Sequence, residues 1–206
     1  MISTVQNICV FDLETSGLSA EKNAILEIAC CPFNNELVDL KEYESGVTSI
    51  YDNREISEQA LQANGITMQQ IENGRDSKEV ADELMSYLSK LSSGRNKVIL
   101  AGHNIVRFDV PFLDNFMRYH KHDISKYVNM DFHIDTMWFA RLKWTELTNY
   151  KLGTCCEETG VELVNAHRAI NDTRANKDLL KDFIRSLRSD HKQSGEDNYK
   201  RPVFQF

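Results

Sequence analysis

The sequence predicts an α/β fold in which a mixed five-stranded sheet carries helices on both faces. Residues 5–13 have the pattern of a strand whose apolar side chains lie on both faces of the pleat, which is typical of a central strand covered on either side. The later apolar segments have the pattern of two more strands and then of strand, helix, strand and helix. This order implies three antiparallel strands followed by two parallel ones.

The remaining strands are expected at four places. Residues 24–33 form a second buried strand, and residues 36–48 alternate like a longer, half-exposed third strand. The short link at Asn34 makes these two strands a hairpin. Two short strands are expected over residues 97–101 and 132–135.

Helical patterns occupy the segments between and after these strands. Residues 57–73 contain one or two short helices broken at Gly65, and Ser77 is the expected N-cap of an amphipathic helix that ends at residue 91. Further helices are expected over residues 106–120, over a segment that carries Trp138, Phe139 and Leu142, and over residues 170–187.

The length and composition favour one domain. The chain has 206 residues, of which 41% are hydrophobic, and this suits a single core. We expect the domain to occupy residues 1–188 and a polar, charged tail to occupy residues 189–206. The sequence lacks a membrane-length apolar run and a secretory leader pattern. Five cysteines without a C-x-x-C pair argue against a disulfide framework and a zinc site, so the expected location is the cytoplasm.

The charge is unevenly distributed along the chain. The formal net charge is −7, but residues 1–90 carry −10 and residues 91–206 carry +3. A mildly basic second half can present a local positive surface to a phosphate chain. The acidic total therefore does not exclude a nucleic-acid partner.

Two carboxylates interrupt the first strand. Asp12 and Glu14 are two residues apart, so they project from the same face of the strand. Burying two like charges costs several kcal/mol per ion, roughly, unless a cation neutralises them, and carboxylate oxygens suit a hard cation such as Mg²⁺. In the alternative interpretation, the pair lies at the exposed end of the strand and caps the turn that ends at Gly17.

Two other segments carry further candidates. Asp109 follows Phe108 at the start of an apolar helix, a position where an acid is also favoured by the helix dipole. His167 precedes Asp172 by five residues. Because five residues of regular helix rotate by about 500°, the two can cooperate only if His167 lies in the loop before the helix. Taken alone, a histidine such as His167 is more often an ordinary surface histidine or one whose hydrogen bonds are satisfied within the fold.

Together these segments resemble the three motifs of the DEDDh exonucleases. This DnaQ-like family includes RNase T and the proofreading epsilon subunit of replicative polymerases. The resemblance extends over about residues 5–184 and includes FDLETSGL, GHNIVRFDVPFL, DTMWFARL and AHRAINDTRAN. It departs from many members at Ser16, where they carry threonine.

The resemblance implies an RNase H-like fold and a metal-dependent 3′→5′ exonuclease. Such an enzyme releases nucleoside monophosphates from single-stranded ends, here of DNA more than RNA. It also implies two divalent cations, Mg²⁺ or Mn²⁺, held by Asp12, Glu14, Asp109 and Asp172, with His167 as the general base. Two such ions would balance the four negative charges of these carboxylates. The implied substrate contacts are Thr15, Leu18 and Phe108, although Phe108 also fits a role in the core.

Basic residues and the tail suggest further contacts. A set of cations on the last helix could contact phosphates or could form a solvated face: Arg168, Arg174, Lys177 and Lys181. The sequence VFQF at residues 203–206 could dock on a polymerase or a sliding clamp.

Three other functions remain open. An oligoribonuclease-like or RNase T-like enzyme would trim RNA, but the usual oligoribonuclease sequence DLEMTGL is not matched by DLETSGL. A non-catalytic module would be expected to have lost one of the five key residues, and this chain keeps all of them. A polymerase-associated proofreading or scaffold subunit is supported only by the tail.

Overall fold

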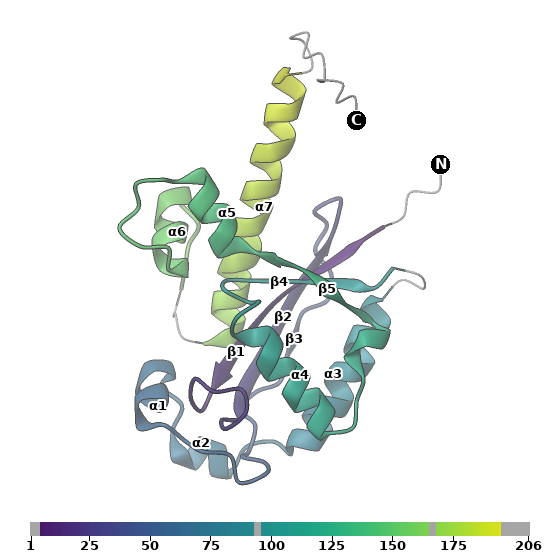
Figure 1. The fold of residues 1–206 in the computed structure, drawn as a ribbon, viewed down its shortest axis with the longest axis vertical. Coiled ribbons are helices and arrows are strands. Elements are labelled where there is room, and N and C mark those ends of the chain that lie inside the picture. Colours follow the sequence, from purple (N-terminus) through teal and green to yellow (C-terminus); the bar gives the residue numbers. More distant parts are fainter. Residues whose placement is uncertain (1–4, 93–95, 165–167, 195–206) are drawn as a thin grey trace, which may run out of the picture.

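The computed structural model describes residues 5–92, 96–164 and 168–194, which form a five-stranded sheet in the order β3-β2-β1-β4-β5 (Figure 1). The strands are β1 (Asn7–Thr15), β2 (Ile25–Asn34), β3 (Tyr43–Glu44), β4 (Val98–Gly102) and β5 (Val128–Asp135). The pairs β1–β2 and β2–β3 are antiparallel, whereas β1–β4 and β4–β5 are parallel. The predicted fold class and the central position of β1 are confirmed.

Helices cover both faces of this sheet (Figure 1). Helices α3 (Ser77–Leu91) and α4 (Asp109–Tyr119) bury their apolar residues in the main core on one face. Helix α7 (Ala169–Ser194) lies against β1 and β2 on the other. The remaining helices are α1 (Glu58–Asn64), α2 (Met68–Glu72), the short 3-10 helix η1 (Ile124–Lys126), and the α7 neighbours α5 (Thr136–Lys143) and α6 (Leu152–Thr159).

The alternation of β1 decides which face receives the carboxylates. Cys9, Phe11 and Leu13 belong to the main core. Ile8 and Val10 point the other way and pack in a second cluster with Leu180 of α7. Because side chains two residues apart share a face, Asp12 and Glu14 lie on the α7 side of the sheet.

The predicted third strand over residues 36–48 is wrong in extent, because only β3 forms a regular ladder there. Pro32 of β2 accepts a hydrogen bond from the Leu40 N–H, but proline has no N–H to return. Between the end of β2 and the start of β3, the only ladder contact of the following chain with β2 is an isolated bridge between Phe33 and Asp39. The missing donor explains why a continuous hairpin ladder does not form.

Several helix ends differ from the prediction. Asp76, not Ser77, is the N-cap of α3, and its side chain accepts from two backbone N–H groups of the first turn. Gly65 does end α1, in the left-handed region at φ +70°. Helix α6 was not anticipated, and α7 continues to Ser194, past the expected domain boundary at residue 188. The VFQF segment lies outside the described residues.

All five cysteines are buried and free. Among the described residues, no helix is long and apolar enough to cross a membrane.

Candidate active site

The first two carboxylates lie at the end of β1, on the α7 face. In the antiparallel pair with β2, Asp12 is opposite Ala29 and Glu14 is opposite Glu27. A register shift between Glu14 and Thr15 then ends the regular alternation. Both acids therefore lie in the last regular part of β1, before the chain leaves the sheet.

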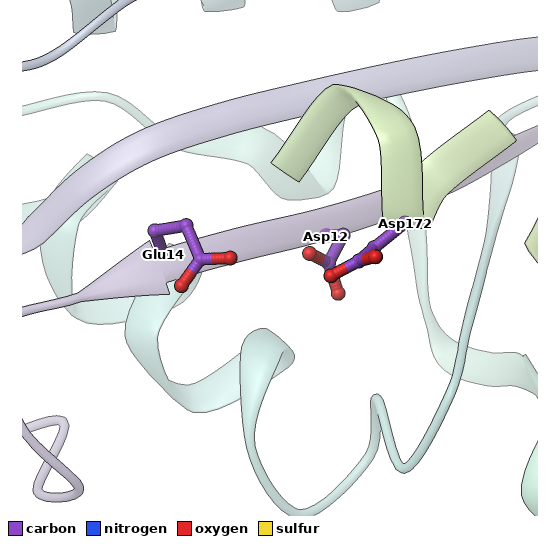
Figure 2. A group of neighbouring side chains, drawn as sticks. All are labelled: Asp12, Glu14 and Asp172. Atoms are coloured by element: carbon purple, nitrogen blue, oxygen red, sulfur yellow. The ribbon is translucent and has the colours of Figure 1, made fainter. Parts of the chain in front are cut away.

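Asp172 joins these two acids from the first turn of α7. Its backbone N–H bonds to the Arg168 carbonyl at the start of the helix. Carboxylate oxygens of Asp12, Glu14 and Asp172 lie within 4.8 Å of one another. Figure 2 shows Asp172 reaching from α7 to the side of Asp12, with Glu14 further along β1. Residues 160 positions apart thus form one acidic cluster.

Asp109 lies beside this cluster at the first position of α4. Its side chain is only 3% exposed and is hydrogen bonded to the backbone of Leu13. Its charge raises the pKa of Asp12, which places it in the same electrostatic neighbourhood. The loop before α4 is fixed by Asp135, whose Oδ1 accepts from the N–H groups of both Asn104 and Met137. Asp135 thus caps α5 and also positions the segment that leads to Asp109.

Burial and mutual repulsion raise the pKa of Asp12, Glu14 and Asp109. The pKa of Asp12 is well above its usual value, mainly through burial and then through Asp109, Glu14 and Asp172. Burial, followed by Asp172 and Glu27, raises the pKa of Glu14 to about 7. Burial is also the main reason that the pKa of Asp109 reaches about 8. A divalent cation would relieve this repulsion, and an all-carboxylate set matches the preference of hard cations for oxygen.

Sequence reasoning missed two polar residues next to Glu14. Asn64, at the end of α1, is 6% exposed. It hydrogen bonds the Glu14 carboxylate and donates to the Thr15 carbonyl at 3.2 Å. Glu27 of β2 is 1% exposed and pairs with Arg168. An asparagine before a glycine is an ordinary helix-end signal, so the sequence alone gave no reason to select Asn64.

The turn after β1 has one buried and one exposed candidate. Thr15 is buried and donates from Oγ1 to the Gly17 carbonyl at 2.7 Å. Leu18 is 87% exposed, so its side chain is available for contact. A Cβ on Gly17 would stand 2.4 Å from the Asn23 side chain, so the glycine is required by close approach. Phe108 is half-buried and packs against the main core.

The next residues to be located are the predicted general base and the basic residues of α7. His167 lies outside the described residues. A solvated face is the wrong expectation for Lys177 and Lys181, because both are buried and ion paired with Asp39. Arg174 is exposed, as expected, and is paired with Glu42. These charges are neutralised within the protein.

Comparison with known protein families identifies the family to which the chain belongs. The sequence model of the RNase_T family, described as exonuclease, matches residues 9–180. The chain belongs to this exonuclease family. Its matched segment contains Asp12, Glu14, Asp109 and Asp172, and the assignment to the DEDD 3′→5′ exonucleases is confirmed.

Relatives of this exonuclease chain include much longer proteins. It is 33% identical over 180 residues to the PolC-type DNA polymerase III of Oceanobacillus iheyensis, covering 86% of this chain and 11% of that protein. It is 32% identical over 173 residues to the Bacillus subtilis protein of the same name, covering 83% and 11%. The chain therefore spans about a tenth of the length of these relatives.

Solved structures share the fold of this exonuclease chain. Escherichia coli Exonuclease I in complex with a dT13 oligonucleotide superposes with a TM-score of 0.75 at 18% identity, over 92% of this chain and 43% of that one. The zinc-bound form of the E. coli enzyme with single-stranded DNA gives 0.74 at 20% identity, over 92% and 45%. The expected RNase H-like fold is confirmed.

Proposed function

We propose that this chain is a divalent-metal-dependent enzyme that removes nucleoside monophosphates from the 3′ ends of single-stranded nucleic acid, DNA in preference to RNA. The observation that carries the proposal is the convergence of Asp12, Glu14 and Asp172 within 4.8 Å on the fold of an exonuclease family. The DNA preference is supported by relatives named DNA polymerases and by the DNA oligonucleotides bound to Exonuclease I.

The acidic cluster would hold the metal. Asp12, Glu14 and Asp172 supply the ligands, and Asp109 completes the set from the start of α4. When bound there, two Mg²⁺ or Mn²⁺ ions would supply charge stabilisation to the attacking and leaving oxygens of an in-line displacement at phosphorus. Asn64 holds the Glu14 carboxylate in place by a hydrogen bond.

His167 is the proposed general base. A histidine that titrates near neutrality can accept the proton of the attacking water, a contribution of about 10²–10⁴-fold in rate. The water oxygen bonds to phosphorus as the P–O3′ bond breaks, and the departing O3′ takes a proton from solvent. The shortened strand keeps a 3′-hydroxyl, and the released nucleotide carries a 5′-phosphate. Thr15 and Leu18 are the proposed contacts of the terminal nucleotide, and Phe108 is the proposed stacking partner of a base.

The test is a digestion of 5′-labelled single strands. Wild-type protein with Mg²⁺ or Mn²⁺ is expected to shorten DNA one nucleotide at a time from the 3′ end. EDTA should stop the reaction and added metal should restore it. Activity that persists in excess EDTA, or that is equal in Asp12→Ala, would refute the proposal. Matched RNA strands and dinucleotides in the same assay distinguish it from an RNA-trimming enzyme.

A second candidate is proofreading in association with a polymerase. It is supported by the PolC-type relatives, in which a segment like this chain is part of a DNA polymerase. Faster removal of a mismatched than of a matched primer terminus would favour it. Deletion of residues 195–206 should then abolish binding to the polymerase or clamp and leave turnover on single strands unchanged. If the shortened chain still binds the polymerase or clamp and keeps its turnover on single strands, a docking role for this segment is excluded.

A further inference from the structure

Glu27 is a buried carboxylate that faces a member of the acidic cluster. It is 1% exposed and stands directly opposite Glu14 in the β1–β2 pair. Cross-strand partners project from the same face of the sheet, and like charges in these positions are destabilising. Glu27 therefore requires a compensating contact.

That contact is the beginning of α7. Nη2 of Arg168 lies 2.5 Å from Oε1 of Glu27, and the Ala169 N–H also donates to the Glu27 carboxylate. Ala169 is the first residue of α7, and Arg168 accepts the backbone bonds of Asn171 and Asp172. Glu27 thus binds both the side chain before the helix and the first backbone N–H within it.

This arrangement replaces a local helix cap. The first N–H groups of a helix lack partners inside the helix, and the positive end of its dipole favours an anion. A cap is normally a serine, threonine, aspartate or asparagine just before the helix, but Arg168 has no acceptor in its side chain. Glu27, 141 residues earlier than Arg168, supplies the anion from β2.

We propose that Glu27 is a positioning residue that anchors the start of α7 so that Asp172 lies beside Asp12 and Glu14. Asp172 is in the first turn of α7, and β1 and β2 are neighbours in one rigid sheet. A bond between β2 and the first residue of α7 therefore fixes Asp172 relative to the acids of β1. The inference rests on the proposed function, because it assigns Glu27 to the assembly of the metal-binding cluster.

The test measures Mn²⁺ binding to the full chain by calorimetry and by electron paramagnetic resonance. Glu27→Gln keeps the shape and one acceptor oxygen but removes the charge. We expect it to weaken Mn²⁺ binding by about 10–100-fold, as is usual for groups that orient metal ligands. Arg168→Gln should act in the same direction, and the double variant should be no weaker than the worse single variant, because both remove one interaction.

A matched control and a rescue distinguish positioning from general loosening. Glu42→Gln removes the partner of Arg174, further along the same helix, and should leave Mn²⁺ binding unchanged. At saturating Mn²⁺, Glu27→Gln should recover most of the nuclease rate, whereas Asp172→Asn should not. Equal losses in Glu42→Gln and Glu27→Gln would overturn the proposal.

The remaining outcomes are also decisive. Wild-type Mn²⁺ affinity in both Glu27→Gln and Arg168→Gln would overturn the positioning role. If circular dichroism shows that Glu27→Gln is unfolded, Arg168→Gln decides alone, because its side chain is 43% exposed and its loss leaves the core intact. If Asp172→Asn binds Mn²⁺ like the wild type, the proposed function itself fails, whatever the behaviour of Glu27.

Discussion

Raising the pH should destabilise the metal-free protein, because the Glu14 carboxyl then ionises in a buried site. Replacing Glu14 by glutamine should remove this effect. The folded protein raises the pKa of Glu14 from 4.5 to about 7, mainly through burial and then through Asp172 and Glu27. The folded state therefore holds this proton more tightly than the unfolded state. The associated stability is complete below pH 4.5 and is lost as the pH rises through about 7.

The size of the effect follows from the two pKa values. Because one pKa unit is worth ~1.4 kcal/mol, ionising Glu14 in the folded protein costs about 3 kcal/mol of unfolding free energy by pH 8. Asp109, whose pKa is raised to about 8, acts in the same direction. Burial lowers the pKa of His103, which acts in the opposite direction because a histidine kept neutral stabilises the fold as the pH rises. The difference between wild type and Glu14→Gln cancels the contribution of His103. The charge of Glu14 raises the pKa of Asp12 and of Asp109, so their pKa values fall in the variant and add to the gain in stability at high pH.

The assay is urea unfolding in EDTA at several pH values from 4.5 to 8. We expect the two proteins to be nearly equal at pH 4.5, and Glu14→Gln to be more stable by about 3 kcal/mol at pH 8. Added Mn²⁺ should reverse this order at pH 8, because only the wild type retains the full ligand set and metal binding stabilises the folded state. A difference that does not change with pH would refute the reasoning.

Three further outcomes are expected. His167→Ala should lower the exonuclease rate by about 10²–10⁴-fold and abolish the rise of rate with pH near neutrality, while Mn²⁺ binding is retained; an unchanged pH–rate profile would exclude this residue as the base. Leu18→Ala should leave the unfolding free energy within about 0.5 kcal/mol, because the side chain is 87% exposed, and should raise KM for single-stranded DNA; an unchanged KM would remove Leu18 from the substrate contacts. Gly17→Ala should cost about 1–3 kcal/mol in urea unfolding, because Asn23 is held by hydrogen bonds to Ser19 and Glu55 and cannot yield easily, and Asn23→Ala should recover part of the loss.

Local patterns were sufficient to predict the central strand and its carboxylates. The alternation of β1 is set by the two-residue period of a strand, so the shared face of Asp12 and Glu14 could be read from the sequence. The break at Gly65 was also predictable, because a left-handed helix end favours glycine. The convergence of Asp172 with the strand came from the resemblance to a family, since periodicity carries no information about which distant elements meet.

Interactions between distant segments explain what could not be predicted. Pro32 removed one donor from the hairpin, and this loss shortened the third strand although its own residues alternate correctly. Glu27 has the sequence context of a strand residue, and its role depends on Arg168 of another element. Asp76 and Ser77 are both good caps, and only the geometry of the chain decides between them.

The placement of α7 has a consequence for synthesis on the ribosome. Asp12 and Glu14 leave the ribosome about 160 residues before Asp172, the acid that completes their cluster. A nascent chain that has not yet exposed this helix has no complete cluster, however well its sheet has formed. Cleavage competence should therefore arise only after nearly the whole domain has left the exit tunnel, and truncated translation products should be inert toward nearby nucleic acid.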